Sequence, residues 1–175
     1  LLNNTNFAAQ LPAVSQLPFG VCYKPINRLK LAFDAQMSGW SAYDELAIDF
    51  VGLDAPFDQI IAKNYSDAWA FRFGAEFAMT NRLDLRAGFI VDTTPVDENN
   101  FNPETPGMTR YEPTIGLSFR PIKNLSVDLA FTYIAGDARK GSIESTDFLT
   151  NQPNKFSAEY DLEALIPAIG LSYSF

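Results

Sequence analysis

Apolar side chains recur at every second position along most of the chain. Around residues 67–80, for example, Trp69, Phe71 and Phe73 alternate with small or charged residues. Because successive side chains of a β-strand point to opposite faces of a sheet, this period of two predicts strands with one apolar and one polar face. The pattern predicts seven strands, near residues 13–24, 29–50, 67–80, 82–94, 109–120, 124–137 and 160–175. Their lengths suit strands that cross a bilayer, which need roughly 9–11 residues.

The connections between these strands alternate between short and long. Tight turns rich in proline and asparagine are expected at residues 25–28, 80–82 and 121–124, and long polar loops near 41–66, 93–109 and 137–161. This is the organisation of an outer-membrane β-barrel, whose short turns face the periplasm and whose long loops face the exterior. At Ser38-Gly39 the apolar positions change from odd to even, which predicts a β-bulge.

Four of the strands end in a related pattern. Each contains a glycine on the polar face, and three residues later an aromatic residue on the apolar face. The aromatic residues are Tyr23, Phe77, Phe119 and Tyr173. Their matched positions favour an aromatic girdle at the periplasmic interface of a membrane. The alternative is that strands accept aromatic residues wherever they are half buried.

The polar faces carry charges of both signs. The basic residues are Lys30, Arg72, Arg86 and Arg120, and the acidic residues are Asp34, Glu76, Asp84, Asp92, Glu112 and Asp128. Opposite charges in the middle of neighbouring strands suit a hydrated lumen. A soluble β-sandwich also alternates and is the main alternative, but its polar face should be dominated by lysine, serine and threonine. We therefore predict an all-β, antiparallel transmembrane β-barrel segment over residues 1–175.

Composition narrows the class of protein. The 175 residues are 47% apolar and 14% aromatic with a net charge of −8, which excludes a disordered chain and argues against nucleic acid as a partner. The chain has no histidine and a single cysteine, Cys22, so imidazole-based catalysis and internal disulfides are excluded. No apolar run approaches the roughly 20 residues of a membrane helix. The first residues do not form a signal peptide, so we expect a mature chain or an internal fragment.

Several stretches resemble the FadL/OmpP1/TodX family of outer-membrane transporters. They comprise residues 29–40 followed by 43–46, residues 67–69 with Gly74, residues 85–88 leading to 92–96, and residues 169–175. The most specific element is an Arg-x-Gly…Asp-x-x-Pro-Val spacing, which begins at Arg86 and ends at Val96. The resemblance extends from about Leu11 to the last residue.

The resemblance implies a barrel of about 14 strands, plugged by an N-terminal hatch, in the bacterial cell outer membrane. Such proteins take up hydrophobic small molecules such as long-chain fatty acids or aromatic hydrocarbons. Residues 1–175 resemble only the C-terminal half. Because a complete bacterial barrel has an even number of strands and unpaired edges are costly in lipid, we expect the missing strands in an N-terminal barrel half or a second chain.

A ligand with an anionic head would need inward basic side chains. We predict Arg86 and Arg72 on the lumen wall, and Lys63 at the mouth, as ligand-binding residues, because charge-assisted hydrogen bonds hold carboxylates well. The alternative for both arginines is structural: ion pairs with Glu76, Asp84 or Glu112 that keep the strands in register. No catalytic motif, cofactor motif or metal-ligand spacing is present, so we predict neither an enzyme nor a metal site.

The predicted exterior loops are acidic and partly apolar. The acids are Asp44, Glu45, Asp49, Asp54, Asp58, Asp97, Glu98 and Glu104, which are interpreted as a solvated surface near outer-membrane lipid and lipopolysaccharide. The apolar residues are Ile60, Ile61, Phe148 and Leu149. These residues support an alternative function, a family-like barrel that acts as a structural scaffold or protein-docking component of an outer-membrane secretion complex.

Overall fold

The computed structural model describes residues 6–50, 59–97, 107–146 and 152–175, and these form an all-β chain with one short 3₁₀ turn. The elements are β1 (Phe7–Ala9), β2 (Gln16–Ile26), β3 (Leu29–Ser38), η1 (Trp40–Ala42), β4 (Glu45–Phe50), β5 (Gln59–Ala62), β6 (Ala68–Ala78), β7 (Leu83–Asp92), β8 (Arg110–Ile122), β9 (Leu125–Gly136), β10 (Arg139–Thr146), β11 (Pro153–Tyr160) and β12 (Glu163–Tyr173). Within the described ranges, no helix has the length and apolar character needed to cross a membrane.

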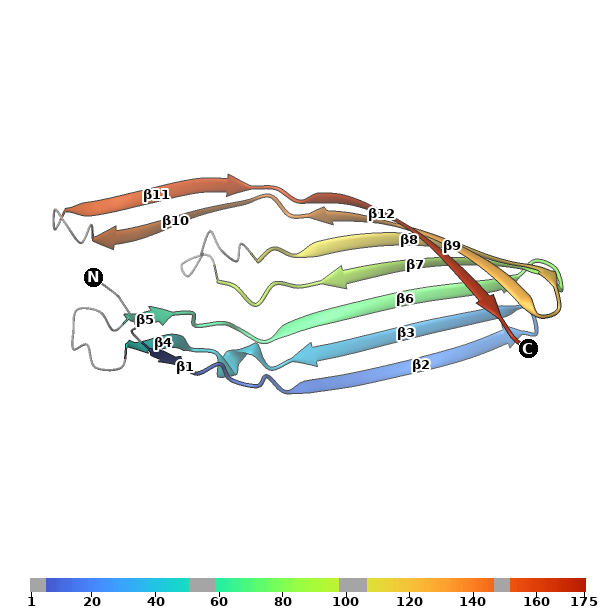
Figure 1. Ribbon diagram of the computed structural model, residues 1–175, viewed down its shortest axis with the longest axis horizontal. Coiled ribbons are helices and arrows are strands. Elements are labelled where there is room, and N and C mark those ends of the chain that lie inside the picture. Colours follow the sequence, from blue (N-terminus) through green and yellow to red (C-terminus); the bar gives the residue numbers. More distant parts are fainter. Residues whose placement is uncertain (1–5, 51–58, 98–106, 147–151) are drawn as a thin grey trace.

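One long, curved sheet forms the body of the molecule (Figure 1). In the described part of the chain its seven strands follow the order β12-β9-β8-β7-β6-β3-β2, and every neighbouring pair is antiparallel. These are the seven alternating segments that the sequence predicts. At one end tight turns join β2 to β3, β6 to β7 and β8 to β9, and at the other end lie the longer connections.

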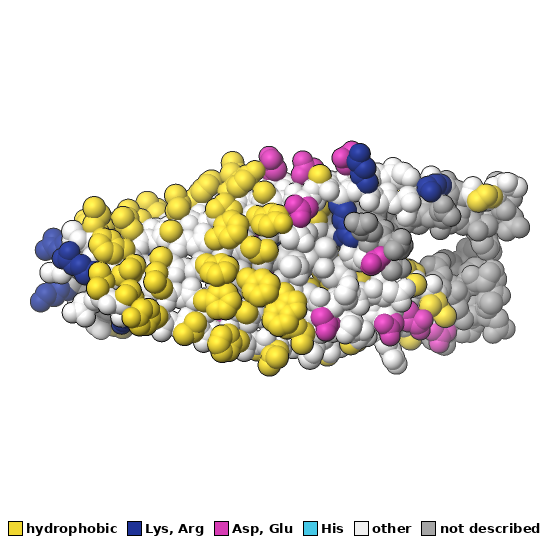
Figure 2. Space-filling view, turned by 180° about the vertical axis from the view of Figure 1, so that it is seen from behind, with side chains coloured by type: hydrophobic (Ala, Val, Ile, Leu, Met, Phe, Trp, Pro, Cys, Tyr) yellow, Lys and Arg dark blue, Asp and Glu magenta, His cyan; other side chains and the backbone are white. Residues whose placement is uncertain are grey.

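The registers put the odd-numbered apolar residues of all seven strands on the same face. Phe33 pairs with Phe73, and Phe73 pairs with Phe89, so aromatic rings continue across three strands. Phe73 is 51% exposed and Ile169 is 74% exposed, although both are in the middle of strands. Figure 2 shows this apolar surface as a broad band. A sheet whose large apolar side chains face outward is typical of a membrane barrel, so the β-sandwich alternative is wrong.

The four aromatic residues of the predicted girdle all lie on this outer face and are exposed. Tyr23 is in the same cross-strand row as Ala75, and Phe77 lies two residues further along. Phe119 lies two residues beyond the cross-strand row of Phe77, and Tyr173 lies two residues beyond the row of Phe119. A constant stagger of this kind is what tilted strands of a barrel require, so each ring keeps the same distance from its turn.

The exterior segments contain more strand than the sequence predicts. The expected continuous strand at 29–50 ends at Ser38, where η1 replaces the predicted bulge, and β4 then pairs with β1 and β5. Within the loop expected at 137–161, β10 and β11 form a hairpin that extends beyond the main sheet. Polar hairpins keep their backbone groups paired outside the bilayer, and alternation of apolar residues is not needed there.

The two edges of the main sheet are β2 and β12. Among the described strands, β2 pairs with β3 alone and β12 with β9 alone. The curved sheet is thus a partial barrel, as predicted. Its edge strands offer backbone N–H and C=O groups to further strands.

Candidate ligand path on the lumen face

The concave face of the sheet carries the even-numbered residues, and its centre is lined by small side chains. One cross-strand row runs through Ala32, Gly74, Gly88, Thr114 and Thr132, on five successive strands. Charged residues flank this row on both sides along the strands. The lumen wall therefore has a central stripe without bulky groups between two charged belts.

The belt nearer the short turns is a connected network. Arg86 Nε donates to Glu76 Oε2 at 2.8 Å, and Arg86 Nη1 donates to Ser118 Oγ at 2.7 Å. Lys30 pairs with the other oxygen of Glu76, and Ser118 donates to Asp128. Ser118 is 1% exposed, so the network has a buried centre. Five strands are thereby joined by side chains as well as by backbone hydrogen bonds.

The belt nearer the exterior consists of two arginine-centred groups. Arg72 forms an ion pair with Asp34 and a hydrogen bond of 3.2 Å from Nη1 to Gln36 Oε1. Arg110 forms an ion pair with Asp92, and its Nε lies 3.6 Å from Glu112 Oε1. Both arginine side chains remain about two-fifths exposed, so each can still contact a molecule in the lumen.

A hollow of about 570 Å³ lies between the two belts. Its floor includes the small residues of the central row, and Arg72 and Arg86 lie at its two ends along the strands. A site with an apolar floor and a few polar groups at its ends suits an elongated hydrophobic molecule with one polar end.

The two central glycines have different packing. A Cβ atom added at Gly88 would lie 2.6 Å from Thr114 Oγ1 and 3.1 Å from the carbonyl oxygen of Phe73. A Cβ atom at Gly74 would have only the Ala32 methyl nearby, at 4.0 Å. Gly88 is therefore required by a close approach of its neighbours, whereas Gly74 borders open space in the hollow.

A second hollow, of about 600 Å³, lies at the exterior end of the lumen. Arg72 and Arg110 contribute to its wall, and Trp40, Met108 and Leu162 add apolar surface from three separate connections. Because Arg72 lines both hollows, it marks the passage from one to the other.

The segment between Asp92 and Val96 organises this mouth. The backbone N–H of Trp69 donates to Thr93 Oγ1 at 2.8 Å, and that of Val96 donates to Thr94 Oγ1 at 3.1 Å. Arg139 reaches from β10 and donates to the carbonyl oxygens of Val96 and Gly107. The Asp-x-x-Pro-Val part of the predicted motif thus links the β7–β8 connection to β6 and β10, and it does not line the hollow between the two belts.

Polar and aromatic contacts also hold η1 against the start of β6. The N–H of Ser41 donates to Asp67 Oδ1 at 3.0 Å. Hydrogen bonds from the Ser41 hydroxyl and backbone lower the pKa of Asp67 below its usual 3.8. Tyr43 and Tyr65 form an edge-to-face pair with ring centroids 5.4 Å apart, and burial raises the pKa of Tyr43.

The structure brings two of the three predicted ligand residues to the lumen. Arg72 and Arg86 line it, and Arg86 forms the ion pair with Glu76 that the structural alternative predicts. Arg72 also forms an ion pair, but with Asp34, which that alternative did not name. Lys63 is only 6% exposed, follows β5, and donates its backbone N–H to the carbonyl of Asp44 at 2.7 Å. Lys63 lines neither hollow. Arg110 was missed, although its place on the polar face of a predicted strand was a usable signal.

The acidic exterior residues do not form a metal site where they are described. No group of three or more metal-ligating side chains occurs in the described ranges. Asp54, Asp58, Glu98, Glu104, Phe148 and Leu149 lie outside the described residues. Of the apolar residues considered for protein docking, Ile60 lies in β5 and is 71% exposed.

Comparisons with known proteins agree with this geometry. The family model of the outer membrane protein transport proteins (OMPP1/FadL/TodX) matches residues 3–175. A 47 kDa outer membrane protein of Pasteurella multocida (strain Pm70) is 24% identical over 126 residues, which are 72% of this chain and 29% of that protein.

Two solved structures share the fold. A FadL homologue of Pseudomonas aeruginosa superposes with a TM-score of 0.82 at 20% identity, over 95% of this chain and 37% of that one. The P. putida toluene transporter TodX superposes with a TM-score of 0.56 at 17% identity, over 95% and 36%. The chain thus spans little more than a third of these relatives. It belongs to the OMPP1/FadL/TodX family of outer-membrane proteins and forms part of such a protein's β-barrel.

Proposed function

We propose that this protein carries hydrophobic small molecules, such as long-chain fatty acids, across the outer membrane, and that the present chain forms part of the wall along which they move. The observation that carries the proposal is the lumen hollow with a floor of small residues between two charged belts. The family supports transport in general, and the amphiphilic lining favours cargo with one polar end.

The arrangement suggests how such a cargo is held. A carboxylate head at the mouth would bind between Arg72 and Arg110, which line the exterior hollow together. Its hydrocarbon chain would then lie over Gly74, where no side chain occupies the floor. Burial of apolar surface provides about 0.8 kcal/mol per methylene group, so even a short contact with this floor favours an apolar tail. Without cargo, ion pairs with Asp34 and Asp92 on the neighbouring strands hold the two arginines at the wall.

A substitution that fills the floor tests this proposal. Gly74→Leu places a large side chain in the hollow without an immediate clash, because the nearest atom to its Cβ is 4.0 Å away. Gly170→Leu is the matched control, since Gly170 is on the same face of the sheet but does not line the hollow. A Cβ atom added at Gly170 would lie 3.6 Å from the nearest atom, so this variant also has no immediate clash. In cells that express the whole protein, uptake of labelled oleate should fall for Gly74→Leu alone. Equal uptake in the two variants, at equal amounts of assembled barrel, would refute the path.

Arginine variants separate ligand binding from wall stability. Arg72→Gln removes the cation at the passage, whereas Arg86→Gln disrupts the five-strand network. If the head group binds at the mouth, Arg72→Gln weakens binding of oleate more than binding of an uncharged hydrocarbon. If both arginines are purely structural, the two variants change barrel stability and leave this ratio unchanged.

A further inference from the structure

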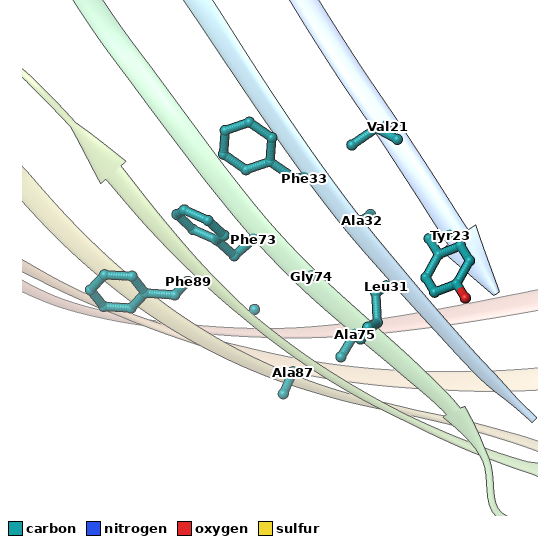
Figure 3. Close-up of a pocket in the computed structure, with 11 residues that line it drawn as sticks. Val21, Tyr23, Leu31, Ala32, Phe33, Phe73, Gly74, Ala75, Ala87 and Phe89 are labelled. Atoms are coloured by element: carbon teal, nitrogen blue, oxygen red, sulfur yellow. The ribbon is translucent and has the colours of Figure 1, made fainter. Parts of the chain in front are cut away.

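The outer face of the sheet is hollowed in the middle of its apolar band. Figure 3 shows the rings of Phe33, Phe73 and Phe89 in a row across β3, β6 and β7, with the small side chains of Ala75 and Ala87 beside them. The rings of Phe33 and Phe73 have centroids 5.0 Å apart. The resulting groove has a volume of about 590 Å³ and reaches Tyr23 and Leu31 on the side of the β2–β3 turn.

A second depression of about 570 Å³ continues this groove across β7, β8 and β9. Ala75 and Ala87 belong to both depressions, and Ile115 and Phe131 lie on the far side. The two alanines pair directly across β6 and β7. The groove therefore exists because two methyl groups occupy a row in which the surrounding side chains are large.

Arginine residues lie at the periplasmic end of the same strands. Arg28 is in the β2–β3 turn and Arg82 in the β6–β7 turn, and both are exposed. The Ala78 N–H donates to the Arg28 carbonyl at 2.8 Å, and the Arg120 N–H donates to the Arg82 carbonyl at 2.8 Å, so both turns pack against the adjoining strands. Figure 2 shows basic side chains gathered at this end, and beyond the other end of the apolar band mainly acidic side chains with some basic ones among them.

The groove lies at the depth of one lipid leaflet from these turns. Leu31 is three residues from Arg28, about 10 Å along a strand, and Ala87 is five residues from Arg82, about 17 Å. With a strand tilt of about 40°, the second distance corresponds to about 13 Å of depth. Half of a hydrocarbon core of about 30 Å is similar, so an acyl chain anchored at the turns extends into the groove.

We propose that the groove binds an acyl chain of an anionic phospholipid from the periplasmic leaflet, with its phosphate at Arg28 and Arg82. The positive charges of the two arginines favour an anionic lipid in the periplasmic leaflet over a lipid anchored from the exterior. A lipid anchored from the exterior leaflet would place its phosphates near the acidic end of the sheet, where like charges repel them. The bound lipid would cover the wall over Ala75 and Ala87. This proposal is independent of the cargo, because the groove and the lumen are on opposite faces.

Native mass spectrometry of the whole protein in detergent tests the proposal. Phosphatidylglycerol and phosphatidylcholine with identical acyl chains are the probes, because the first is anionic and the second is zwitterionic with no net charge. Each basic residue near an anionic lipid favours binding by roughly fivefold, so two arginines give a preference of about 25-fold for phosphatidylglycerol. The double variant Arg28→Gln/Arg82→Gln should remove this preference, while Lys123→Gln, in the β8–β9 turn, should retain it.

A second pair of variants tests the groove. Ala75→Leu/Ala87→Leu fills it and should weaken binding of both lipids, whereas Ala135→Leu, on the outer face but outside both depressions, should not. Equal binding of the two lipids to the unmodified protein would overturn the charge assignment. Undiminished binding to the filled variant would overturn the groove assignment. Oleate uptake by the Arg28→Gln/Arg82→Gln variant should be unchanged, which keeps this result separate from the transport proposal.

Discussion

The position of the bilayer on the outer face can be tested by placing one charge at different depths of β6. This strand has 11 residues, Ala68–Ala78, and Phe73 is its central residue. At about 3.3 Å per residue and a tilt of about 40°, the strand spans about 28 Å along the membrane normal. An outer apolar band of about 25 Å therefore has its midplane near Phe73 and its edge near Phe77.

Arginine at these positions has a predictable cost. On the lipid face it costs about 2–4 kcal/mol at the midplane and about 0–1 kcal/mol near the interface. Phe73→Arg should therefore destabilise the barrel by about 2–4 kcal/mol and Phe77→Arg by about 1 kcal/mol or less beyond the lost apolar surface. Phe73→Leu and Phe77→Leu measure that loss, and Thr132→Leu is the corresponding reference on the lumen face. Thr132→Arg, on the lumen face of β9, should be nearly neutral because its charge enters water.

The assay is reversible unfolding of the whole protein in phospholipid vesicles, followed by tryptophan fluorescence over a urea series. The free energies are compared as differences between arginine and leucine at the same position, so that side-chain size and ring contacts largely cancel. A similar arginine cost at Phe73, Phe77 and Thr132 would refute the assignment of lipid to the odd-numbered face. A larger cost at Thr132 than at Phe73 would reverse it.

Three further perturbations follow from the contacts of the wall and the mouth. Glu76→Gln removes the carboxylate shared by two cations, and should lower the free energy of unfolding by about 1–3 kcal/mol in the same urea assay. Gly88→Ala should destabilise by about 1–3 kcal/mol through the clash with its cross-strand threonine, whereas Gly74→Ala should be neutral or slightly stabilising; equal effects would contradict the packing. Because the hydrogen bonds from Ser41 lower the pKa of Asp67, the ionised Asp67 carboxylate stabilises η1 fully above pH 3.8. This stabilisation is lost as the pH falls through the lower folded-state pKa. Protection of the Ser41 N–H from hydrogen exchange, measured relative to its intrinsic rate at each pH, should therefore fall at that acidity, and Asp67→Asn should remove the acid-dependent step.

The candidate site was only partly accessible to sequence reasoning. Arg72 and Arg86 could be placed on the lumen face because they occupy even positions in alternating segments. Arg110 follows the same rule and could have been found. Lys63 belongs to a connection, where alternation carries no information about direction, and the structure places it outside both hollows. The mouth unites residues from three separate connections, which no local pattern relates.

The sequence by itself determined which side of each strand meets lipid, because the alternation of side chains follows from the local geometry of an extended backbone. It also determined the short turns and thus which consecutive strands pair as hairpins. Only the tertiary structure decided which residues from different strands share a row. Register places Gly74 beside Gly88 on the lumen face and Ala75 beside Ala87 on the outer face, and so creates a hollow on each side of the same wall. Such contacts depend on the pairing of strands that are distant in sequence, and a shift of two residues would preserve every face while separating these partners.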